Sequence, residues 1–445
     1  MKYRHNLHKE KKDGIYYIRH FSRLFIGLLF IFSGYVKGVD PFGFALKIEE
    51  YLVSFGIDFM TPLAMTLSFF AILAEFVIGI ALICNIQMKL TSWALLLFMG
   101  FFTVLTFWLA YALDIVNIIN SIFNKNYNIF VVTDCGCFGD FIVLSNTETF
   151  YKNIIFLFFT LIIVHQRKKY KHINFHYITQ WLPILLGVIF VLFMTIYCLR
   201  HEPWHDFRPW NKGNFIAAET YSEAPDLDYI FQYKNNKNNT IVEYTVDDLT
   251  KISEDSVRNE DFEKNYTFLD RKEKVVKEGV NAKLSDFTLI DMETTQDLKK
   301  SIIEQGGYHF ILFIHNISKA NLNNFNEIKN FAKKCEEEQI PFIAVTGSTP
   351  KQIEQFNESQ NSSFKFYYSD ETPLKTAIRN NPGLILLKDG YVIDKWSFRD
   401  IPTFDTFKKR IPTYEAKLKK YKTILPPTLP NKTNLDSINY SANNE

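Results

Sequence analysis

The chain has 445 residues, which allows two to four folding units at about 100 to 200 residues per domain. Its 50 lysines and arginines nearly balance 48 aspartates and glutamates, so the formal net charge is only +2. Nucleic-acid-binding proteins concentrate basic side chains on one face, and this balance excludes a nucleic-acid partner. The mean hydropathy of -0.07 averages an apolar first 200 residues and a polar remainder.

Five apolar runs predict membrane-spanning helices, because about 20 apolar residues in helical form cross the hydrocarbon layer. Three runs have the required length by themselves, and they are residues 64–84, 90–113 and 181–199. The shorter runs 24–36 and 153–164 reach that length only if the flanking Arg23, Lys37 and Lys152 extend their charged ends to the interface. The sequence therefore predicts a five-span membrane protein.

The distribution of lysine and arginine predicts the orientation. Leaving out Arg23 and Lys152, which flank the shorter runs, eleven stand before the first span, between the second and third spans, and between the fourth and fifth, whereas the two alternate loops hold three. Basic short loops stay in the cytoplasm, so we expect a multi-pass protein of the bacterial cytoplasmic (inner) membrane with a cytoplasmic N-terminus and an extracytoplasmic, periplasmic C-terminal domain. The long basic lead-in and the lack of a small-residue cleavage site disfavour a cleaved signal peptide.

The loop 114–148 contains the motif Cys135-Gly136-Cys137-Phe138-Gly139. We interpret Cys135 and Cys137 as a catalytic redox pair, because they lie on the predicted oxidising side and the glycines permit a tight turn. A disulfide between cysteines one residue apart closes a very small ring, so it exchanges easily.

Two other interpretations of this loop stay open. The cysteines can form a passive disulfide in a structural turn, and Asp134 and Asp140 would raise the thiol pKa instead of producing a reactive thiolate. Two sulfurs can also bind a soft metal, but the loop has no histidine to complete a closed site, so we expect none.

The remaining cysteines of the membrane half lie at opposite ends of their spans. Cys198 ends the fifth span on the same side as the loop, where it either resolves a mixed disulfide or serves as a small buried apolar side chain. Cys84 ends the second span a full membrane away, and we expect it to be inert.

Glu75 lies near the middle of the second span, where an ionised carboxylate must be paired, protonated or next to a polar cavity. One interpretation is an intramembrane proton relay or a contact to a membrane quinone. The other is a structural hydrogen bond to Ser33, Tyr35 or Lys37 of the first span.

These residues also carry a family resemblance. The motif Cys135-Gly136-Cys137-Phe138-Gly139 before the fourth span resembles the DoxX/MauE group of four-helix bacterial membrane proteins over about residues 15–166. The supporting helix residues are Arg23, Gly27, Ser33, Gly34, Lys37, Glu75, Gly79 and Leu82. The resemblance implies a redox-associated membrane protein. The MauE branch is named for methylamine utilisation, and the resemblance implies help in maturing a disulfide-rich periplasmic dehydrogenase.

The C-terminal part alternates predicted strands and helices and ends in a hairpin at Lys388-Asp389-Gly390. The strands are predicted at 309–315, 342–345, 364–368, 384–387 and 391–396, and the helices at 322–339, 350–360 and 374–378. This order resembles the thioredoxin-like fold, in which Pro382 occupies the place of a cis-proline. Residues 316–320 stand where that family has Cys-x-x-Cys, and they contain no thiol. Cys335 is too far along its helix to substitute, so we expect a catalytically silent module that binds a client peptide beside Pro382.

The predicted fold class is a multi-pass α-helical membrane bundle, a four-helix DoxX/MauE-like core plus a fifth helix, followed by a soluble α/β thioredoxin-like domain. The predicted parts are a basic cytoplasmic tail (1–20), the four-helix membrane domain (21–165), a cytoplasmic loop and fifth helix (166–200), a linker and β-rich region (201–300), the thioredoxin-like domain (301–415) and a disordered tail (416–445). The Trp- and Pro-rich start of the linker suits the lipid interface.

We expect a membrane redox accessory protein that transfers disulfides or electrons through its cysteine pair and supports maturation of extracytoplasmic proteins. Its expected partners are the lipid bilayer and extracytoplasmic client proteins or redox partners, and the only cofactor considered is a membrane quinone. The alternative is a non-enzymatic scaffold or assembly factor whose outer domain binds a partner. A third candidate is a small-solute or metal carrier with Glu75 lining the path.

Overall fold

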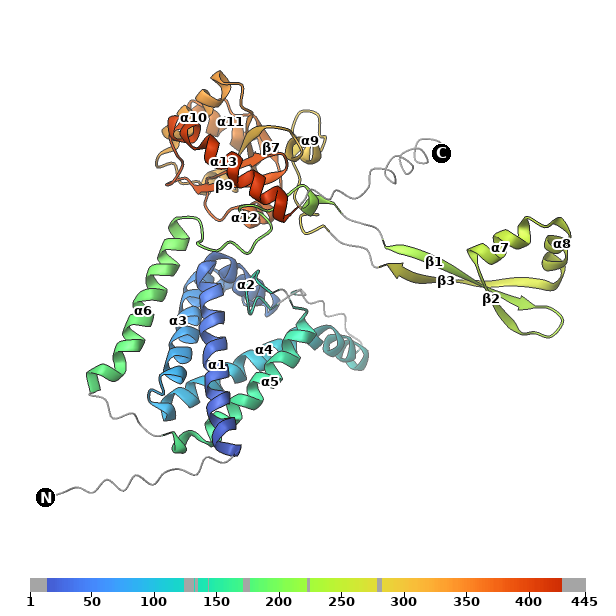
Figure 1. Cartoon of the computed structure of the whole chain (residues 1–445), viewed down its shortest axis with the longest axis horizontal. Coiled ribbons are helices and arrows are strands. Elements are labelled where there is room, and N and C mark those ends of the chain that lie inside the picture. Colours follow the sequence, from blue (N-terminus) through green and yellow to red (C-terminus); the bar gives the residue numbers. More distant parts are fainter. Residues whose placement is uncertain are drawn as a thin grey trace.

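The computed structural model describes residues 14–123, 132, 135–142, 144–170, 177–221, 225–277 and 282–425. Figure 1 shows three parts: a helical bundle, an α/β domain against one end of it, and a β arm that projects from the α/β domain.

The five predicted membrane spans are confirmed as long apolar helices. They are α1 (Gly14–Val39), α3 (Ala64–Ile83), α4 (Met88–Phe123), α5 (Asn146–His165) and α6 (Tyr177–Arg200). Large apolar side chains such as Leu97 and Val104 are about 70% exposed, which suits a lipid-facing surface. The chain is therefore a membrane protein.

Glycines let α1 and α3 approach closely. A Cβ atom at Gly79 would lie 2.9 Å from the carbonyl oxygen of Gly27 and 2.8 Å from the backbone nitrogen of Ile31. Only residues without a side chain permit this approach, which is a common way for helices to pack inside a membrane. A short helix that hydropathy did not predict, α2 (Pro41–Ser54), follows α1 and begins at the N-cap Asp40. A 3₁₀ turn, η1 (Asp58–Leu63), joins it to α3.

The α/β domain has one six-stranded sheet with the order β4-β7-β6-β5-β8-β9. The strands are β4 (Ile290–Asp291), β5 (Tyr308–Ile314), β6 (Phe342–Thr346), β7 (Phe366–Tyr368), β8 (Gly383–Lys388) and β9 (Tyr391–Ser397). Strands β5, β6 and β7 are parallel, and the hairpin β8–β9 pairs antiparallel with β5. The helices are α9 (Lys299–Ile303), α10 (Phe325–Glu337), α11 (Pro350–Gln360), α12 (Glu371–Ala377) and α13 (Phe404–Ile424). This arrangement confirms the predicted thioredoxin-like fold.

The borders predicted for this domain are wrong at both ends. Trp210, expected in a linker at the lipid interface, is fully buried with its ring centroid 5.1 Å from that of Phe287 and 5.6 Å from that of Phe313. The core therefore includes residues on the N-terminal side of position 300. Helix α13 continues to Ile424 because Leu418 packs into the same core, so the tail does not begin at 416. Residues 426–445 of the predicted tail lie outside the described residues.

The arm is inserted between the linker and the main part of the α/β domain (Figure 1). It has the antiparallel sheet order β2-β1-β3, formed by β1 (Asp226–Asn235), β2 (Ile241–Thr245) and β3 (Tyr266–Lys277). Two helices, α7 (Val246–Ser253) and α8 (Ser256–Asn265), close its far end, where Phe262 packs against Tyr233 and Tyr244.

Candidate functional site

The two cysteines of the motif are in contact. The Sγ atoms of Cys135 and Cys137 lie 2.7 Å apart, and both cysteines are free thiols. Gly136 and Gly139 have φ values of +58° and +51°, a left-handed conformation that side chains disfavour. The Gly139 amide donates to the Gly136 carbonyl over 3.0 Å and closes the turn. The two glycines thus allow the turn that brings the sulfurs together.

Three elements of the bundle hold this turn. Ser33 of α1 donates its hydroxyl to the carbonyl oxygen of Cys137 over 3.0 Å, and Tyr51 of α2 donates to the carbonyl oxygen of Cys135. Cys135 is 3% exposed and belongs to an apolar cluster with Leu105 and Leu109 of α4. The motif is therefore fixed at both cysteines, with Cys137 the more accessible of the two.

A buried ion pair lies beside the turn. Lys37 of α1 contacts Glu75 of α3, and their side chains are 2% and 5% exposed. This is one of the structural partners predicted for Glu75, and it shows that Lys37 does not extend to the interface. The second carboxylate oxygen of Glu75, Oε2, has no hydrogen-bond partner among the described residues. A second cation, Lys152 of α5, places its Nζ 4.4 Å from the ring centroid of Phe138, next to Cys137 in the chain.

The environment shifts the pKa values of the two thiols in opposite directions. A hydrogen bond from Cys135 lowers the pKa of Cys137 to about 6, against the effect of burial, and Lys152 and Lys37 lower it further. The same hydrogen bond and burial raise the pKa of Cys135 well above its usual value. At pH 7 Cys137 is mostly thiolate, the nucleophilic form, while Cys135 stays a thiol.

The expectation that the flanking aspartates dominate the thiol pKa is wrong for Asp140, and Asp134 lies outside the described residues. The carboxylate of Asp140 lies 3.6 Å from the Arg379 guanidinium of the α/β domain. Sequence reasoning considered Lys152 only as a charged end of a helix and Lys37 also as a partner of Glu75, and it missed that both lower the pKa of Cys137. The available signal is that Lys37 and Lys152 directly flank the two short spans at the ends predicted to lie on the same side of the membrane as the cysteine motif.

A small cavity of about 40 Å³ joins these groups, and Cys137, Ser33, Lys37, Glu75 and Asn153 line it together with phenylalanines. A site needs roughly 10 to 15 Å³ per water, so it has room for a few water molecules. A benzene-sized ligand needs about 150 Å³. The cavity is smaller than one known to hold benzene, and the quinone contact stays a prediction.

The α/β domain contacts the bundle beside the cysteine turn. Arg379, three residues before Pro382, donates to the carboxylate of Asp40 with distances of 2.6, 3.0 and 3.1 Å. Although partial burial raises the pKa of the Asp40 carboxyl, Arg379 holds it below the usual range. Gly43 makes room for this pair, because a Cβ atom there would lie 2.5 Å from Arg379 Nη2. Asp40 thus caps α2 and anchors the second domain.

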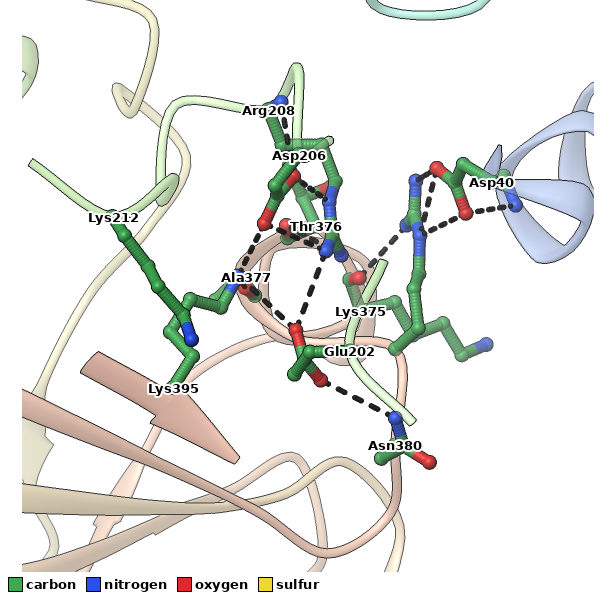
Figure 2. Close-up of polar contacts among 12 residues, drawn as sticks. Asp40, Glu202, Asp206, Arg208, Lys212, Lys375, Thr376, Ala377, Asn380 and Lys395 are labelled. Carbon is green, nitrogen blue, oxygen red and sulfur yellow. Dashed lines mark hydrogen bonds and ion pairs between the residues drawn. The ribbon is translucent and has the colours of Figure 1, made fainter. Parts of the chain in front are cut away.

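A cluster of four charged side chains, of which Arg208 and Lys395 are buried and Glu202 and Asp206 are partly buried, joins the linker to α12 and β9 (Figure 2). Asp206 accepts from Arg208 Nε and from Lys395 Nζ, both over 2.6 Å, and Glu202 lies 3.7 Å from Arg208 and 3.6 Å from Lys395. Lys395 also donates to the carbonyl oxygen of Ala377 over 2.8 Å. Two positive and two negative groups compensate each other, as buried charges require. Sequence reasoning did not find this cluster, because Lys395 is 187 positions after Arg208.

The Asn381–Pro382 bond is cis, as the thioredoxin resemblance implied. The side-chain amide of Asn381 donates to the carbonyl oxygen of Asn316 over 2.8 Å, so the proline lies beside the segment that lacks the thiols. Cys335 is fully buried in α10, and burial raises its pKa to about 12. The role of Pro382 in client binding stays a prediction.

The other two cysteines do not join the pair. Cys198 packs with Val39 and Met194 in an apolar cluster separate from that of Cys135. Cys84 is the C-cap residue of α3, and the charged side chain near it is Arg23. Among the described residues, no group of three His, Cys, Asp or Glu side chains is arranged to hold a metal ion.

Parts of the chain are similar to known proteins. Residues 15–166, which include the cysteine turn, match the family model described as methylamine utilisation protein MauE, and this match supports a redox-associated membrane protein. No curated protein matches the chain. A solution structure of a candidate thioredoxin from Neisseria meningitidis is 16% identical, covering 32% of this chain and 95% of that chain with a TM-score of 0.25. The strand order, not this score, carries the thioredoxin-like assignment.

Proposed function

We propose that this protein exchanges thiols and disulfides, with Cys137 as the nucleophile and Cys135 as the resolving cysteine. The observation that carries the proposal is the contact of the two sulfurs in a turn where Cys137 has a pKa of about 6. A passive structural turn needs no cations beside one of its sulfurs. Lys37 and Lys152 give Cys137 the electropositive environment typical of reactive cysteines.

The exchange has two steps. The Cys137 thiolate attacks a client disulfide, a bond forms between Cys137 and one client sulfur, and the other client sulfur leaves as a thiolate. Cys135 then loses its proton and attacks the Cys137 sulfur, which forms the Cys135–Cys137 disulfide and releases the second client thiolate. The client gains two electrons and the pair loses two. In reverse, the same steps oxidise a client dithiol.

Glu75 and Lys37 are the proposed proton relay for the second step. They line the same cavity as Cys137, and Glu75 Oε2 is free of hydrogen bonds among the described residues, so it can accept one from a cavity water. No step is assigned to a quinone.

The proposed setting is the extracytoplasmic side of a bacterial inner membrane, where extracytoplasmic proteins are the clients. The distribution of basic residues supports this orientation, and a role in maturing such proteins is what the resemblance to the MauE group implies. Disulfides persist on that side. Client binding beside Pro382 belongs to the same proposal.

The test is to trap the exchange intermediate in cells. Cys135→Ser leaves Cys137 able to attack but unable to be resolved, so mixed disulfides with client proteins should accumulate, whereas Cys137→Ser should give none. Cys198→Ser is the matched control, since Cys198 lies in another cluster. If the pair stays fully oxidised in all growth conditions and neither substitution changes client disulfides, thiol exchange is refuted.

A scaffold or assembly factor is the second candidate. The observation that favours it is the number of charged contacts that fix a thioredoxin-like domain without a Cys-x-x-Cys motif on the bundle. In that case Cys135→Ser should leave client disulfides unchanged, while loss of the α/β domain should abolish partner assembly.

A further inference from the structure

A second cavity, of about 200 Å³, lies between the α/β domain and the bundle. Its walls come from four separate stretches of chain: the α1–α2 junction, the cysteine turn, the linker and α12. The contacts of Arg379 with Asp40 and Asp140 hold these walls together. The cavity therefore exists only when the α/β domain is docked on the bundle.

This interdomain pocket reaches the cysteine motif itself. Gly136, the residue between the two cysteines, lines it, and so does Gly139. Lys37 lines both this pocket and the inner cavity that contains Cys137. A group bound in the pocket therefore contacts the backbone of the turn, and Lys37 lies between this group and the Cys137 thiolate.

The pocket's lining indicates what it binds. Four basic side chains, Lys37, Lys47, Arg208 and Arg379, balance four acidic ones, Asp40, Glu50, Asp140 and Asp206. An anion site would carry an excess of positive charge, and an acyl-chain site would be apolar. A lining with donors, acceptors and a few apolar side chains such as Phe44 suits the amide groups of an extended peptide.

We propose that the interdomain pocket binds an extended, cysteine-containing segment of the client and presents its sulfur to the Cys135-Gly136-Cys137 turn. The thioredoxin-like domain then contributes a wall of the substrate site through Thr372, Thr376 and Arg379, and it needs no thiol of its own. This inference rests on the proposed exchange function and names the place where its substrate binds.

The test uses a substitution that fills the pocket from the α/β domain. Thr372 is an exposed residue of the first turn of α12, so Thr372→Trp adds bulk without removing a core contact. Thr372→Arg is a second variant of different chemistry. Lys333→Trp is the matched control, because Lys333 is an exposed residue of α10 that lines a different surface groove. The full chain in lipid nanodiscs, with the pair reduced, is mixed with a ten-residue peptide containing one internal disulfide or with 2-hydroxyethyl disulfide.

We expect both Thr372 variants to slow reduction of the peptide by about tenfold or more, the effect of losing about 1.4 kcal/mol of binding. The small disulfide should react at nearly the wild-type rate, and Lys333→Trp should change neither rate. Unchanged peptide rates in both Thr372 variants would overturn the pocket assignment, as would an equal loss with both substrates. A wild-type chain that reduces neither substrate refutes the exchange function instead, so the two failures are distinguishable.

Discussion

Removing the charge of Lys152 tests the electrostatic origin of the Cys137 thiolate. Lys152 belongs to α5, and its ammonium group lies over the Phe138 ring. It lowers the pKa of Cys137, as do the hydrogen bond from Cys135 and the charge of Lys37. An opposite charge near an ionisable group changes its pKa by about 1 to 3. Taking the lower end, Lys152→Met should raise the pKa of Cys137 from about 6 to about 7.

The rate of alkylation by iodoacetamide reports the thiolate fraction. At pH 6.5 a thiol of pKa about 6 is roughly three-quarters ionised and one of pKa about 7 roughly one-quarter, so the variant should react about three times more slowly. At pH 8.5 both are ionised, and the two rates should converge. Mass spectrometry assigns the alkylated cysteine at each pH.

The control is Lys89→Met, which removes an exposed lysine at the start of α4, away from the cysteine turn. It should leave the pH midpoint of Cys137 at its wild-type value. A midpoint that stays near 6 in Lys152→Met would refute the assignment of Lys152 to the thiolate site. A midpoint near 8.5 in the wild-type chain would remove the reactive thiolate altogether.

Three further changes test the contacts around the site. Lys37→Met should destabilise the bundle by about 3 to 5 kcal/mol, because it leaves Glu75 buried without its cation, and Lys37→Met with Glu75→Leu should recover most of the loss in thermal unfolding in detergent. Arg379→Ala should weaken docking of the α/β domain by about 1 to 3 kcal/mol and expose the linker to protease, whereas Arg271→Ala in the arm should not. Although burial raises the pKa of Asp206, Arg208 and Lys395 hold it below its usual value, so its stabilisation is complete above about pH 4 and is lost only as the pH falls below that. Protease resistance of the linker should therefore stay constant from pH 5 to 8, and a loss within that range would contradict the assignment.

Local sequence patterns predicted the helices and strands, whereas the site depends on contacts between residues that are far apart in the chain. Helix α11 has the predicted bounds 350–360, and the β8–β9 hairpin turns at Asp389-Gly390 as predicted. Both predictions succeed because apolar periodicity and turn residues act within a few positions. Arg379 meets Asp40 from 339 positions away, and no local pattern encodes that contact. The same limit explains why Trp210 was placed at the lipid interface: a Trp- and Pro-rich segment has the same composition in an interfacial belt and in a domain core.

The charges of the site also indicate the direction of exchange. In the reduced site, the negative Cys137 thiolate and Glu75 balance the positive Lys37 and Lys152. Forming the disulfide removes the thiolate charge and leaves one ammonium group without a counter-charge beside a buried ion pair. Groups that stabilise the reduced form make a disulfide a stronger oxidant, so the pair is suited to donating its disulfide to clients. Lys152→Met, by raising the thiol pKa by about one, should lower the reduction potential of the pair by up to about 30 mV, measured against a glutathione redox buffer. An unchanged or higher potential would mean that Lys152 does not favour the reduced form.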